Sequence, residues 1–451
     1  MTKGVTTPFG HPLSNESKRR VNEVRLKITQ PIHPNFNTDF NVYRFILAFE
    51  RIYKKEKDII DAATKLLNNH LRMRKAYKMV HSKYLNFFTV FSFQMDTEEV
   101  LSFNENPLFA RRLMPQGDVL SVTDDSNRLL WYVEYASIDL EGLAHTVSSG
   151  FSIKCQFLEM EYCLRRVMEQ EENTGRLSGI HHIVDLNGYE MNPWAMLFVS
   201  NGNLTYYSQL IHFENYPELV TPIEMVNTAK WIHVPYRLVR GMMPASFNDR
   251  IRLHDENFLD ALQEHVKIEN IPTSLGGTNQ TIRCKVANKF TPDLFWSIKS
   301  DEVLEHLEVV QIAPRKTRQI YVDIEETGLQ ISWYFSTDGD VFFGVFHQFT
   351  EEGTKSKSLT HGLVAEKEVD YDKTEMVYPW IKIAARIVHE TDSVKCERPG
   401  RYWLVFCNQK SWLQRRTVNI VLQITHPDGK KKRLYLDGTS IINPSIDVNE
   451  L

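Results

Sequence analysis

The sequence predicts an α/β domain preceded by a helical module and followed by an all-β sandwich. Three observations support this fold class. Apolar residues recur at helical spacing over positions 39–80, strands alternate with helices over positions 129–266, and short alternating strands with turn signals follow position 310. A chain of 451 residues also exceeds one ordinary domain of about 100–200 residues, so two or three units are expected.

The composition is that of a globular chain with a balanced charge. Hydrophobic residues make up 42% and charged residues 24%, so each unit can bury a core. The 53 basic and 57 acidic residues give no global attraction for nucleic acid, which is therefore not an expected partner. No apolar run approaches the roughly 20 residues that span a bilayer, and the first twenty residues lack the apolar stretch of a secretory signal. These features predict a cytoplasmic protein.

The N-terminal part is expected to begin with a flexible tail and continue as a helical module. Residues 1–37 are polar and contain four prolines, which favours a loosely held tail. Within a module at 38–95, apolar residues over 42–53 and again over 59–80 follow the spacing of one helix face. Asp58 is a capping-type residue before the second run. The pattern predicts an antiparallel helix pair.

The period changes in the next unit, residues 96–277. Strands are predicted at 129–135, 180–186 and 222–227. Helices are predicted at 157–167, 196–213 and 258–266. Strands that alternate with crossover helices predict a largely parallel sheet with covered faces.

After Gly276-Gly277 the pattern becomes that of an all-β unit. Residues 278–310 are expected to be a linker, 311–437 a β-sandwich and 438–451 a C-terminal tail. Alternating apolar residues predict sandwich strands at 331–335, 341–345, 402–406 and 418–422. Because the linker separates two independently patterned cores, a fragment that ends near Gly277 is expected to fold alone.

Several motifs resemble those of known families. Residues 39–45, Asp139-Leu140-Glu141-Gly142-Leu143, Asp185-Leu186-Asn187-Gly188, Asn215-Tyr216-Pro217-Glu218 and Leu275-Gly276-Gly277 follow in the order of the CRAL-TRIO lipid-binding family. Trp333-Tyr334-Phe335, Gly344-Val345-Phe346 and Pro399-Gly400-Arg401-Tyr402 resemble a GOLD domain. The combination is similar to the supernatant protein factor and tocopherol-associated protein group.

The resemblance implies a CRAL-TRIO core with an N-terminal helical module and a GOLD sandwich. It also implies a function: binding a lipid in an apolar pocket and transferring or presenting it at intracellular membranes. The GOLD domain would dock to a protein partner or to an anionic membrane, so the cytoplasmic protein would be transiently membrane-associated. A phospholipid, a sterol and a tocopherol-like molecule all remain possible ligands.

The resemblance also implies a pocket closed by a gate helix. The segment 231–243 is apolar around most of its circumference, as a helix that closes on a ligand or lies on a membrane would be. The alternative for this segment is an ordinary core helix. The alternative for the candidate pocket residues on strands is that they belong to the core, as most apolar strand residues do. The candidate pocket residues are Trp131, Val133, Ile183, Met225, Trp231, Leu238 and Met242, and the candidate gate residues are Val234, Tyr236, Val239, Gly241 and Met243.

Two charged features are candidates for contacts with lipid. Glu218 and Arg250 match positions that contact the inositol headgroup in phosphatidylinositol-binding relatives, although Leu47 and Phe49 replace cations found in many members. The alternative is a charge pair without such a role. If two basic patches lie together, they would attract an anionic membrane by about 1 kcal/mol per residue; otherwise they are solvated turns. The patch residues are Arg315, Lys316, Lys430, Lys431, Lys432 and Arg433.

The sequence offers no catalytic motif. It contains no GxSxG elbow, P-loop, HExxH or glycine-rich dinucleotide motif, so no enzyme activity and no cofactor are expected. Five cysteines without a CxxC pair predict reduced thiols, and adjacent His181 and His182 point to opposite faces of a strand, so no metal site is expected. The alternatives to a lipid carrier are a scaffold that acts through the GOLD domain with a vestigial pocket, and an unrecognised hydrolase.

Overall fold

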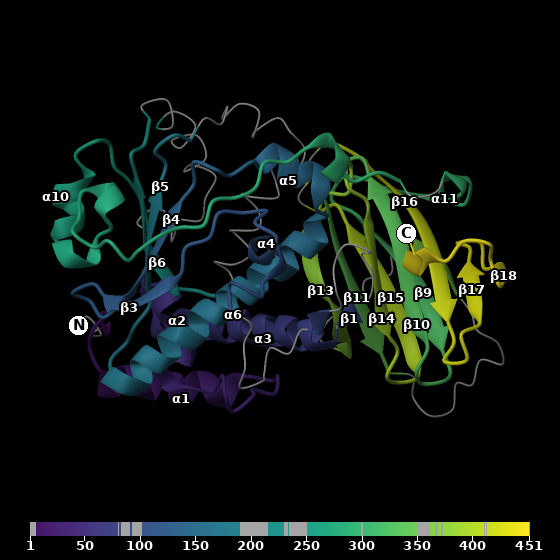
Figure 1. The fold of residues 1–451 in the computed structure, drawn as a ribbon. Helices are drawn as coiled ribbons and strands as arrows, with labels where there is room; N and C mark the ends of the chain where they lie inside the picture. Colours follow the sequence, from purple (N-terminus) through teal and green to yellow (C-terminus); the bar gives the residue numbers. More distant parts are fainter. Residues whose placement is uncertain are drawn as a thin grey trace.

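The computed structural model describes residues 6–79, 81–82, 91–92, 102–189, 215–229, 233, 250–298, 301–349, 361–365, 369–370, 373–409, 411 and 413–450. Helices and a five-stranded sheet form one half, and two further β-sheets form the other (Figure 1). Within these residues, none of the helices has the length and apolar character required to cross a bilayer.

The N-terminal half begins with three helices. They are α1 (Asn15–Lys27), α2 (Asp39–Glu50) and α3 (Glu56–Met79). The helix α1 corrects the expectation of a flexible tail: the Ser14 side chain caps it by accepting the Ser17 N–H, and Val21 and Val24 are fully buried. The four prolines lie before and after α1, and its outer face is polar, so composition alone concealed a helix with a narrow apolar stripe.

The central sheet has the predicted parallel arrangement. Its order is β3 (Val119–Thr123), β4 (Leu129–Glu134), β5 (Ile180–Asp185), β6 (Val220–Val226) and β7 (Ile251–Leu253). The strands β4 to β7 are parallel, and β3 pairs antiparallel with β4. The predicted strands therefore occur close to their expected bounds. The helix predicted at 196–213 lies outside the described residues.

Helices cover both faces of this sheet. The long helix α6 (Ser149–Thr174) packs in the same core cluster as Leu129 and Val133 of β4. On the opposite face, α10 (Phe258–Gln263) packs with Leu130 of β4. Shorter elements are α4 (Pro107–Ala110), α5 (Leu140–Thr146), η3 (Ile268–Asn270), η4 (Thr273–Leu275), η5 (Pro292–Leu294), β1 (His81–Ser82) and β2 (Phe91–Ser92).

The C-terminal half is all-β apart from short helical turns. One antiparallel sheet has the order β14-β10-β16-β17-β18, with β8 paired to β16, and the other has the order β12-β9-β15-β11-β13. Phe335 of β10 meets Phe406 of β15 with ring centroids 5.2 Å apart, so the two sheets face each other across an aromatic core. The strands are β8 (Glu308–Ile312), β9 (Thr317–Ile324), β10 (Gln330–Thr337), β11 (Val341–Gln348), β12 (His361–Ala365), β13 (Glu375–Ile383), β14 (Glu390–Lys395), β15 (Gly400–Cys407), β16 (Arg416–Thr425), β17 (Lys431–Leu434) and β18 (Ser440–Ile442).

The expected linker and C-terminal tail are both parts of the folded body. Within 278–310, Lys285 and Gln116 exchange two backbone hydrogen bonds, and α11 (Glu302–Glu305) and the start of β8 follow. In the last segment, β18 extends a sheet, and Val448 of η7 (Val448–Glu450) is fully buried. Both segments pair with strands or pack against them.

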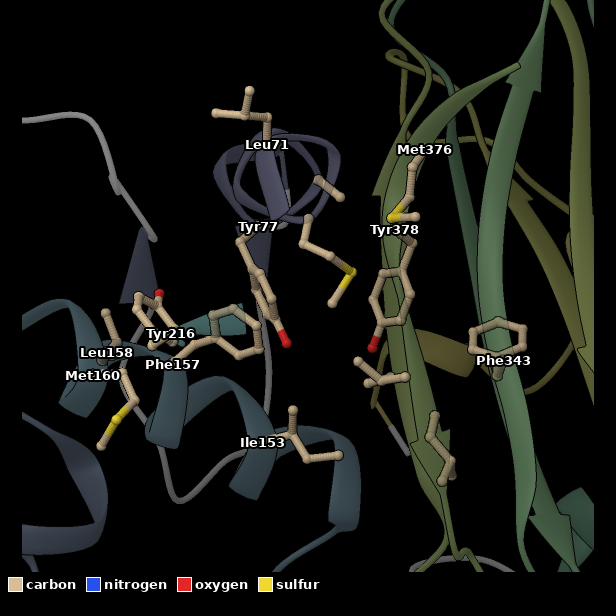
Figure 2. Close-up of a cluster of buried hydrophobic side chains, with 14 of the residues drawn as sticks. Leu71, Tyr77, Ile153, Phe157, Leu158, Met160, Tyr216, Phe343, Met376 and Tyr378 are labelled. Atoms are coloured by element: carbon tan, nitrogen blue, oxygen red, sulfur yellow. The ribbon is translucent and has the colours of Figure 1, made fainter. Parts of the chain in front are cut away.

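The two halves share one core, which corrects the expectation of independent cores. Tyr77 of α3 and Phe157 of α6 lie opposite Tyr378 of β13, and these buried side chains belong to a single apolar cluster (Figure 2). The halves are also joined by a buried ion pair between Lys154 of α6 and Asp392 of β14. The seam between α3, α6 and the strands β13 and β14 is therefore an interior surface of the molecule.

Candidate functional site

The sheet positions three of the predicted pocket residues, Trp131, Val133 and Met225, on one face. Val184 of β5 lies between Val133 of β4 and Met225 of β6 and is the direct neighbour of both. Trp131 lies two positions before Val133 on the same face, where its ring stacks on His182 at 4.0 Å. The face that carries these side chains is covered by α6 and the N-terminal helices.

Ile183 does not belong to this group. It pairs with Tyr132 of β4 and packs with Phe258 and Leu262 on the opposite face of the sheet. Successive strand residues point to opposite faces, so Ile183 cannot line the same pocket as its neighbour Val184. Its inclusion among the pocket residues is therefore a correction.

The predicted gate cannot be placed. Trp231, Leu238 and Met242 of the pocket prediction lie outside the described residues, as do Val234, Tyr236, Val239, Gly241 and Met243 of the gate prediction.

Polar side chains gather where β4 and β5 end, at the carboxyl edge of the parallel strands. Tyr135 follows β4, Tyr189 follows β5, and both are partly buried against the core that contains Val133. Glu159, midway along α6, is close enough for its charge to raise the pKa of Tyr135 further, in addition to the larger effect of burial. Ligands of open parallel sheets bind at this edge, so the position itself indicates a site.

Glu159 is a carboxyl in apolar surroundings. The residues one helical turn before and after it, Cys155 and Cys163, are both buried. Burial raises the pKa of Glu159 to about 8. The sequence reasoning missed this residue. The available signal was a carboxyl inside the apolar run 157–164 of a predicted helix.

Glu161, two residues further along, has a structural role. Its Oε1 accepts hydrogen bonds from Arg74 of α3 and, at 2.6 Å, from the Tyr216 hydroxyl. Buried charges are normally compensated in this way. The contrast with Glu159, for which burial is the one cause of the pKa shift, separates a packing residue from a candidate ligand contact.

The structure brings the predicted headgroup residues together at the other edge of the sheet. Glu218 precedes β6 and Arg250 precedes β7, and Glu218 Oε1 lies 2.6 Å from Arg250 Nη2. Both side chains are deeply buried, with 0% and 2% exposure. Burial lowers the pKa of Arg250, while the charge of Glu218 opposes this effect.

A third charged residue joins this pair. Arg51, directly after α2, places Nη2 3.5 Å from Glu218 Oε2, and its side chain is 41% exposed. The resemblance placed supporting cations at positions 47 and 49, where this chain has Leu47 and Phe49, and it did not indicate Arg51. Leu47 is instead buried in the core of the helical module. The residue directly after α2 thus places next to Glu218 a cation that positions 47 and 49 do not supply.

The predicted membrane patch is split in the structure. Arg315 and Lys316 follow β8, whose last residue pairs with Arg416 at the start of β16, whereas Lys431 pairs with Thr425 at its end. At about 3.3 Å per residue, the two groups lie roughly 30 Å apart along the sheet. Moreover, Lys430 and Lys431 pair with Asp428 and Asp447, and Arg433 is buried. The six residues therefore do not form one surface, which corrects that expectation.

The two adjacent histidines have structural partners. His181 Nδ1 lies 3.0 Å from Asp124 Oδ2, and His182 Nδ1 lies 3.0 Å from the Trp131 carbonyl oxygen. Across the described part of the chain, His, Cys, Asp and Glu side chains do not assemble into a group of three or more that could hold a metal ion.

Comparison with known proteins gives matches to three family models. Residues 118–277 match the model of the CRAL/TRIO domain. Residues 13–82 match a domain of unknown function, DUF8435, and residues 295–433 match the F28H7_8_C-like C-terminal domain. These residues include the whole central sheet, so the central part of the chain is similar to a CRAL/TRIO domain.

The chain is also similar to individual proteins. CRAL-TRIO domain-containing protein F28H7.8 of Caenorhabditis elegans is 23% identical over 424 residues, which cover 93% of each chain. Among solved structures, that of Sfh5 is 14% identical, covers 59% of this chain and 81% of its own, and aligns with a TM-score of 0.36. The C-terminal match has the name of the worm protein's own domain, and the GOLD assignment remains a prediction.

Proposed function

We propose that this protein binds one hydrophobic lipid between the central sheet and α6 and transfers or presents it at intracellular membranes. The proposal rests on a combination found on one face of the sheet: apolar side chains together with polar side chains that are only partly buried. Val133 and Met225 supply walls, and Glu159 and Tyr135 supply the polar end. Small-molecule sites are mostly apolar with a few convergent polar groups, as here.

The location supports a carrier rather than a solid core. Met225, Tyr135 and Glu159 are only partly buried, although the residues on either side of Met225 along β6 and of Glu159 along α6 are buried. Protein interiors are otherwise close-packed, so partial accessibility at the carboxyl edge of the sheet fits a space that a ligand fills. The C-terminal sheets would then serve for docking to a partner or to a membrane, which makes the cytoplasmic carrier transiently membrane-associated.

Two measurements on protein purified from its own source test the proposal: mass spectrometry of the intact protein and analysis of its organic extract. One equivalent of lipid per chain is expected. An empty protein in repeated preparations would contradict the proposal. An empty pocket together with a tightly bound protein partner would favour the scaffold function.

A pair of tryptophan variants places the lipid on one face of the sheet. Met225→Trp fills the proposed pocket, so the protein should fold but contain less than a tenth of the wild-type lipid. Leu259→Trp is the matched control, because Leu259 is also partly buried but packs on the opposite face. Equal lipid content in the two variants would show that the lipid does not occupy the α6 face.

A second candidate ligand, phosphatidylinositol, rests on the cluster of Arg51, Glu218 and Arg250. Arg250→Glu is an unsuitable test, because it would place two carboxylates in one buried site. Arg51→Gln removes the exposed cation and leaves the buried pair intact. If the inositol phosphate binds here, this variant should lose about tenfold in transfer of phosphatidylinositol between vesicles, since arginine holds phosphate by charge-assisted hydrogen bonds.

Arg19→Gln is the control for this experiment, because Arg19 is an exposed arginine of the same helical module that pairs with Glu16 and Glu23 and not with Glu218. Phosphatidylcholine transfer should change in neither variant. If Arg51→Gln transfers phosphatidylinositol at the wild-type rate, this cluster is not a headgroup site.

A further inference from the structure

The turn between α2 and α3 carries apolar and basic side chains on the surface of the molecule. Residues 51–55 separate the two helices, and all five are exposed. Ile52 is 46% exposed and Tyr53 is 41% exposed, so two adjacent large apolar side chains lie in water. Single exposed apolar residues are common, whereas an apolar patch with a polar rim marks a contact with a protein or a membrane.

The turn has a defined conformation. The Phe49 carbonyl oxygen accepts hydrogen bonds from the Ile52 N–H at 3.0 Å and from the Tyr53 N–H at 2.9 Å. The Tyr53 ring also stacks on the Phe49 ring, with centroids 5.9 Å apart. The end of α2 therefore holds the apolar side chains in place, and a partner that binds them has little backbone to order.

Three lysines next to these apolar side chains lack a counter-charge. Lys54, Lys55 and Lys57 are exposed, and none of them forms an ion pair within the described residues. Asp58 follows them as an exposed carboxylate, so the segment keeps an excess of positive charge. The chain as a whole has a net charge of -4. A local excess of the opposite sign therefore selects which part of the molecule an anionic surface meets.

The nearest glutamates do not offset the lysines. Glu50 pairs with Arg20 at 2.6 Å, and Glu56 pairs with Arg19. Both arginines belong to α1, so the packing of the helical module already neutralises these two carboxylates. The lysine charges thus remain available to a partner outside the chain.

We infer that the α2–α3 turn docks the protein to an anionic membrane, with Ile52 and Tyr53 among the lipid headgroups and the lysines at the phosphates. The inference rests on the proposed function and names the surface that meets the membrane. Peripheral proteins bind anionic lipid through apolar side chains that enter the interface and cations that stay at its surface. Tyrosine suits the interface because its ring is apolar and its hydroxyl stays hydrated.

A second exposed apolar pair provides the comparison. Ile441 and Ile442 of β18 are 49% and 69% exposed and lie beside β17. The lysines there are neutralised by the ion pairs Lys430–Asp428 and Lys431–Asp447. The two surfaces thus have similar apolar exposure, and they differ in the charge that is left for an anionic partner.

Co-sedimentation of the full chain with vesicles tests the inference. Vesicles of phosphatidylcholine mixed with phosphatidylserine should bind the protein about tenfold more tightly than vesicles of phosphatidylcholine alone. Added salt should weaken this binding, because it screens exposed charges. Two double variants, Ile52→Ser with Tyr53→Ser and Lys54→Gln with Lys55→Gln, should each bind the mixed vesicles about tenfold more weakly than the wild type.

Matched variants of the sandwich control for the loss of any apolar pair or charge. Ile441→Ser with Ile442→Ser, and Lys430→Gln with Lys432→Gln, should bind the mixed vesicles as the wild type does. Circular dichroism of each variant separates loss of docking from loss of fold. Tyr53→Ser alone should weaken binding several-fold, which gives a readout even if a double variant of the turn is poorly folded.

Each possible outcome decides between the hypotheses. Wild-type binding by the folded turn variants would overturn the inference, and so would a loss found only in the sandwich variants. The lipid content of the purified proteins separates this result from the proposed function. A chain that contains lipid but binds neither kind of vesicle would overturn the docking surface and leave the carrier function intact. Vesicle binding that depends on the turn, by a chain that never contains lipid, would support the docking surface and contradict the carrier function.

Discussion

At the scale of single residues, environment separates carboxyls that look alike in the sequence. Glu159 and Glu161 lie two positions apart on α6, but Glu161 is compensated by Arg74 and Glu159 is not. Arg74 comes from α3, so the different roles of the two carboxyls arise only when the helices pack. Pairs of titratable groups that are held in different environments are a usual feature of functional sites.

The raised pKa of Glu159 predicts how the stability of the ligand-free protein depends on pH. The pKa is about 8 in the folded chain and 4.5 for an unperturbed group, so the folded state binds more protons between these values. The free energy of unfolding should therefore fall as pH rises from about 5 to about 8. Other groups facing this site are Tyr135, Tyr189, Cys155 and Cys163, whose pKa values are all raised above this window.

Urea unfolding of ligand-free protein at pH 5 and pH 8 measures this effect. Glu159→Gln should be more stable than the wild type at pH 8 and about equal to it at pH 5. Glu169→Gln should follow the wild type at both values. A wild-type and a Glu159→Gln protein with the same pH dependence would mean that Glu159 is ionised throughout.

Removal of one partner of the Glu218–Arg250 pair should be costly. Arg250→Met leaves the Glu218 carboxylate buried next to the exposed Arg51 alone, and a broken buried pair typically costs about 3–5 kcal/mol of stability. The double variant Glu218→Leu, Arg250→Met should regain most of that loss, because no charge then stays buried. Chemical denaturation of the wild type, both single variants and the double variant checks the cycle. Additive losses in the double variant would show that the two charges are not coupled.

At the scale of elements, α6 connects the candidate site to the C-terminal half. Ser148 caps its first turn, and Gly175, with a φ of 66°, ends it. Glu390 of β14 also accepts hydrogen bonds from Gly150 N and Ser149 Oγ. A Cβ at Gly150 would lie 2.6 Å from Glu390 Oε2, so a larger residue here would force the Glu390 carboxylate to shift. A residue of the sandwich thus accepts hydrogen bonds from the first turn of α6, the helix that carries Glu159.

Glu390→Leu should destabilise the protein through this turn. The Gly150 N–H and the Ser149 hydroxyl would lose their buried acceptor, which costs about 1–3 kcal/mol per unsatisfied group. Thermal unfolding followed by circular dichroism gives the change, and Glu397→Leu, an exposed position before β15, is the control. Identical midpoints for Glu390→Leu and the wild type would show that the contact does not contribute to stability.

The elements differ in how far the sequence predicts them. The alternation of short apolar strands with helices located the strands of the central sheet. Helical spacing located α2, α3 and α6, because each of these helices has one apolar face. Helix α1 escaped because its polar outer face dominates its composition. Ile183 was placed on the wrong face because strand register, which aligns it with Tyr132, depends on pairing that a single strand does not encode. Arg51 and Glu159 escaped because their surroundings come from distant segments.

At the scale of the whole molecule, the two halves share one buried core. The buried face of α3 and α6 meets β13, with Tyr77, Phe157 and Tyr378 in one apolar cluster (Figure 2). The Tyr378 hydroxyl also donates to Asp392, the partner of Lys154. The seam therefore combines apolar burial with an ion pair that joins the two halves.

A fragment that ends at Gly277 should not retain the native fold. Truncation exposes the apolar face of α3 and α6 and leaves Lys154 without Asp392, and large exposed apolar patches promote aggregation. We expect the fragment to elute as aggregates in size-exclusion chromatography and to bind a hydrophobic dye, in contrast to the full chain. A monomeric fragment with sharp near-ultraviolet circular dichroism would show that the first half folds alone.

The ion pair across the seam allows a sharper test in the full chain. Lys154→Met leaves the Asp392 carboxylate buried without its cation, with hydrogen bonds from the Tyr378 hydroxyl and the Ser393 N–H, so the variant should lose about 3–5 kcal/mol. Lys154→Met with Asp392→Leu should recover most of this. One thermal transition is expected for every variant, as for a single cooperative unit. Two separate transitions in the wild type would contradict the shared core.

The close contact between Gly150 and Glu390 has a consequence for the evolution of the chain. A larger residue at position 150 would displace the Glu390 carboxylate, and a change at Lys154 or Asp392 would leave the other charge buried without its partner. Substitutions on one side of the seam should therefore be accompanied by changes on the other side. A chimera that joins the N-terminal half of this chain to the sandwich of a distant relative should fold only if the residues of the seam are exchanged together with it.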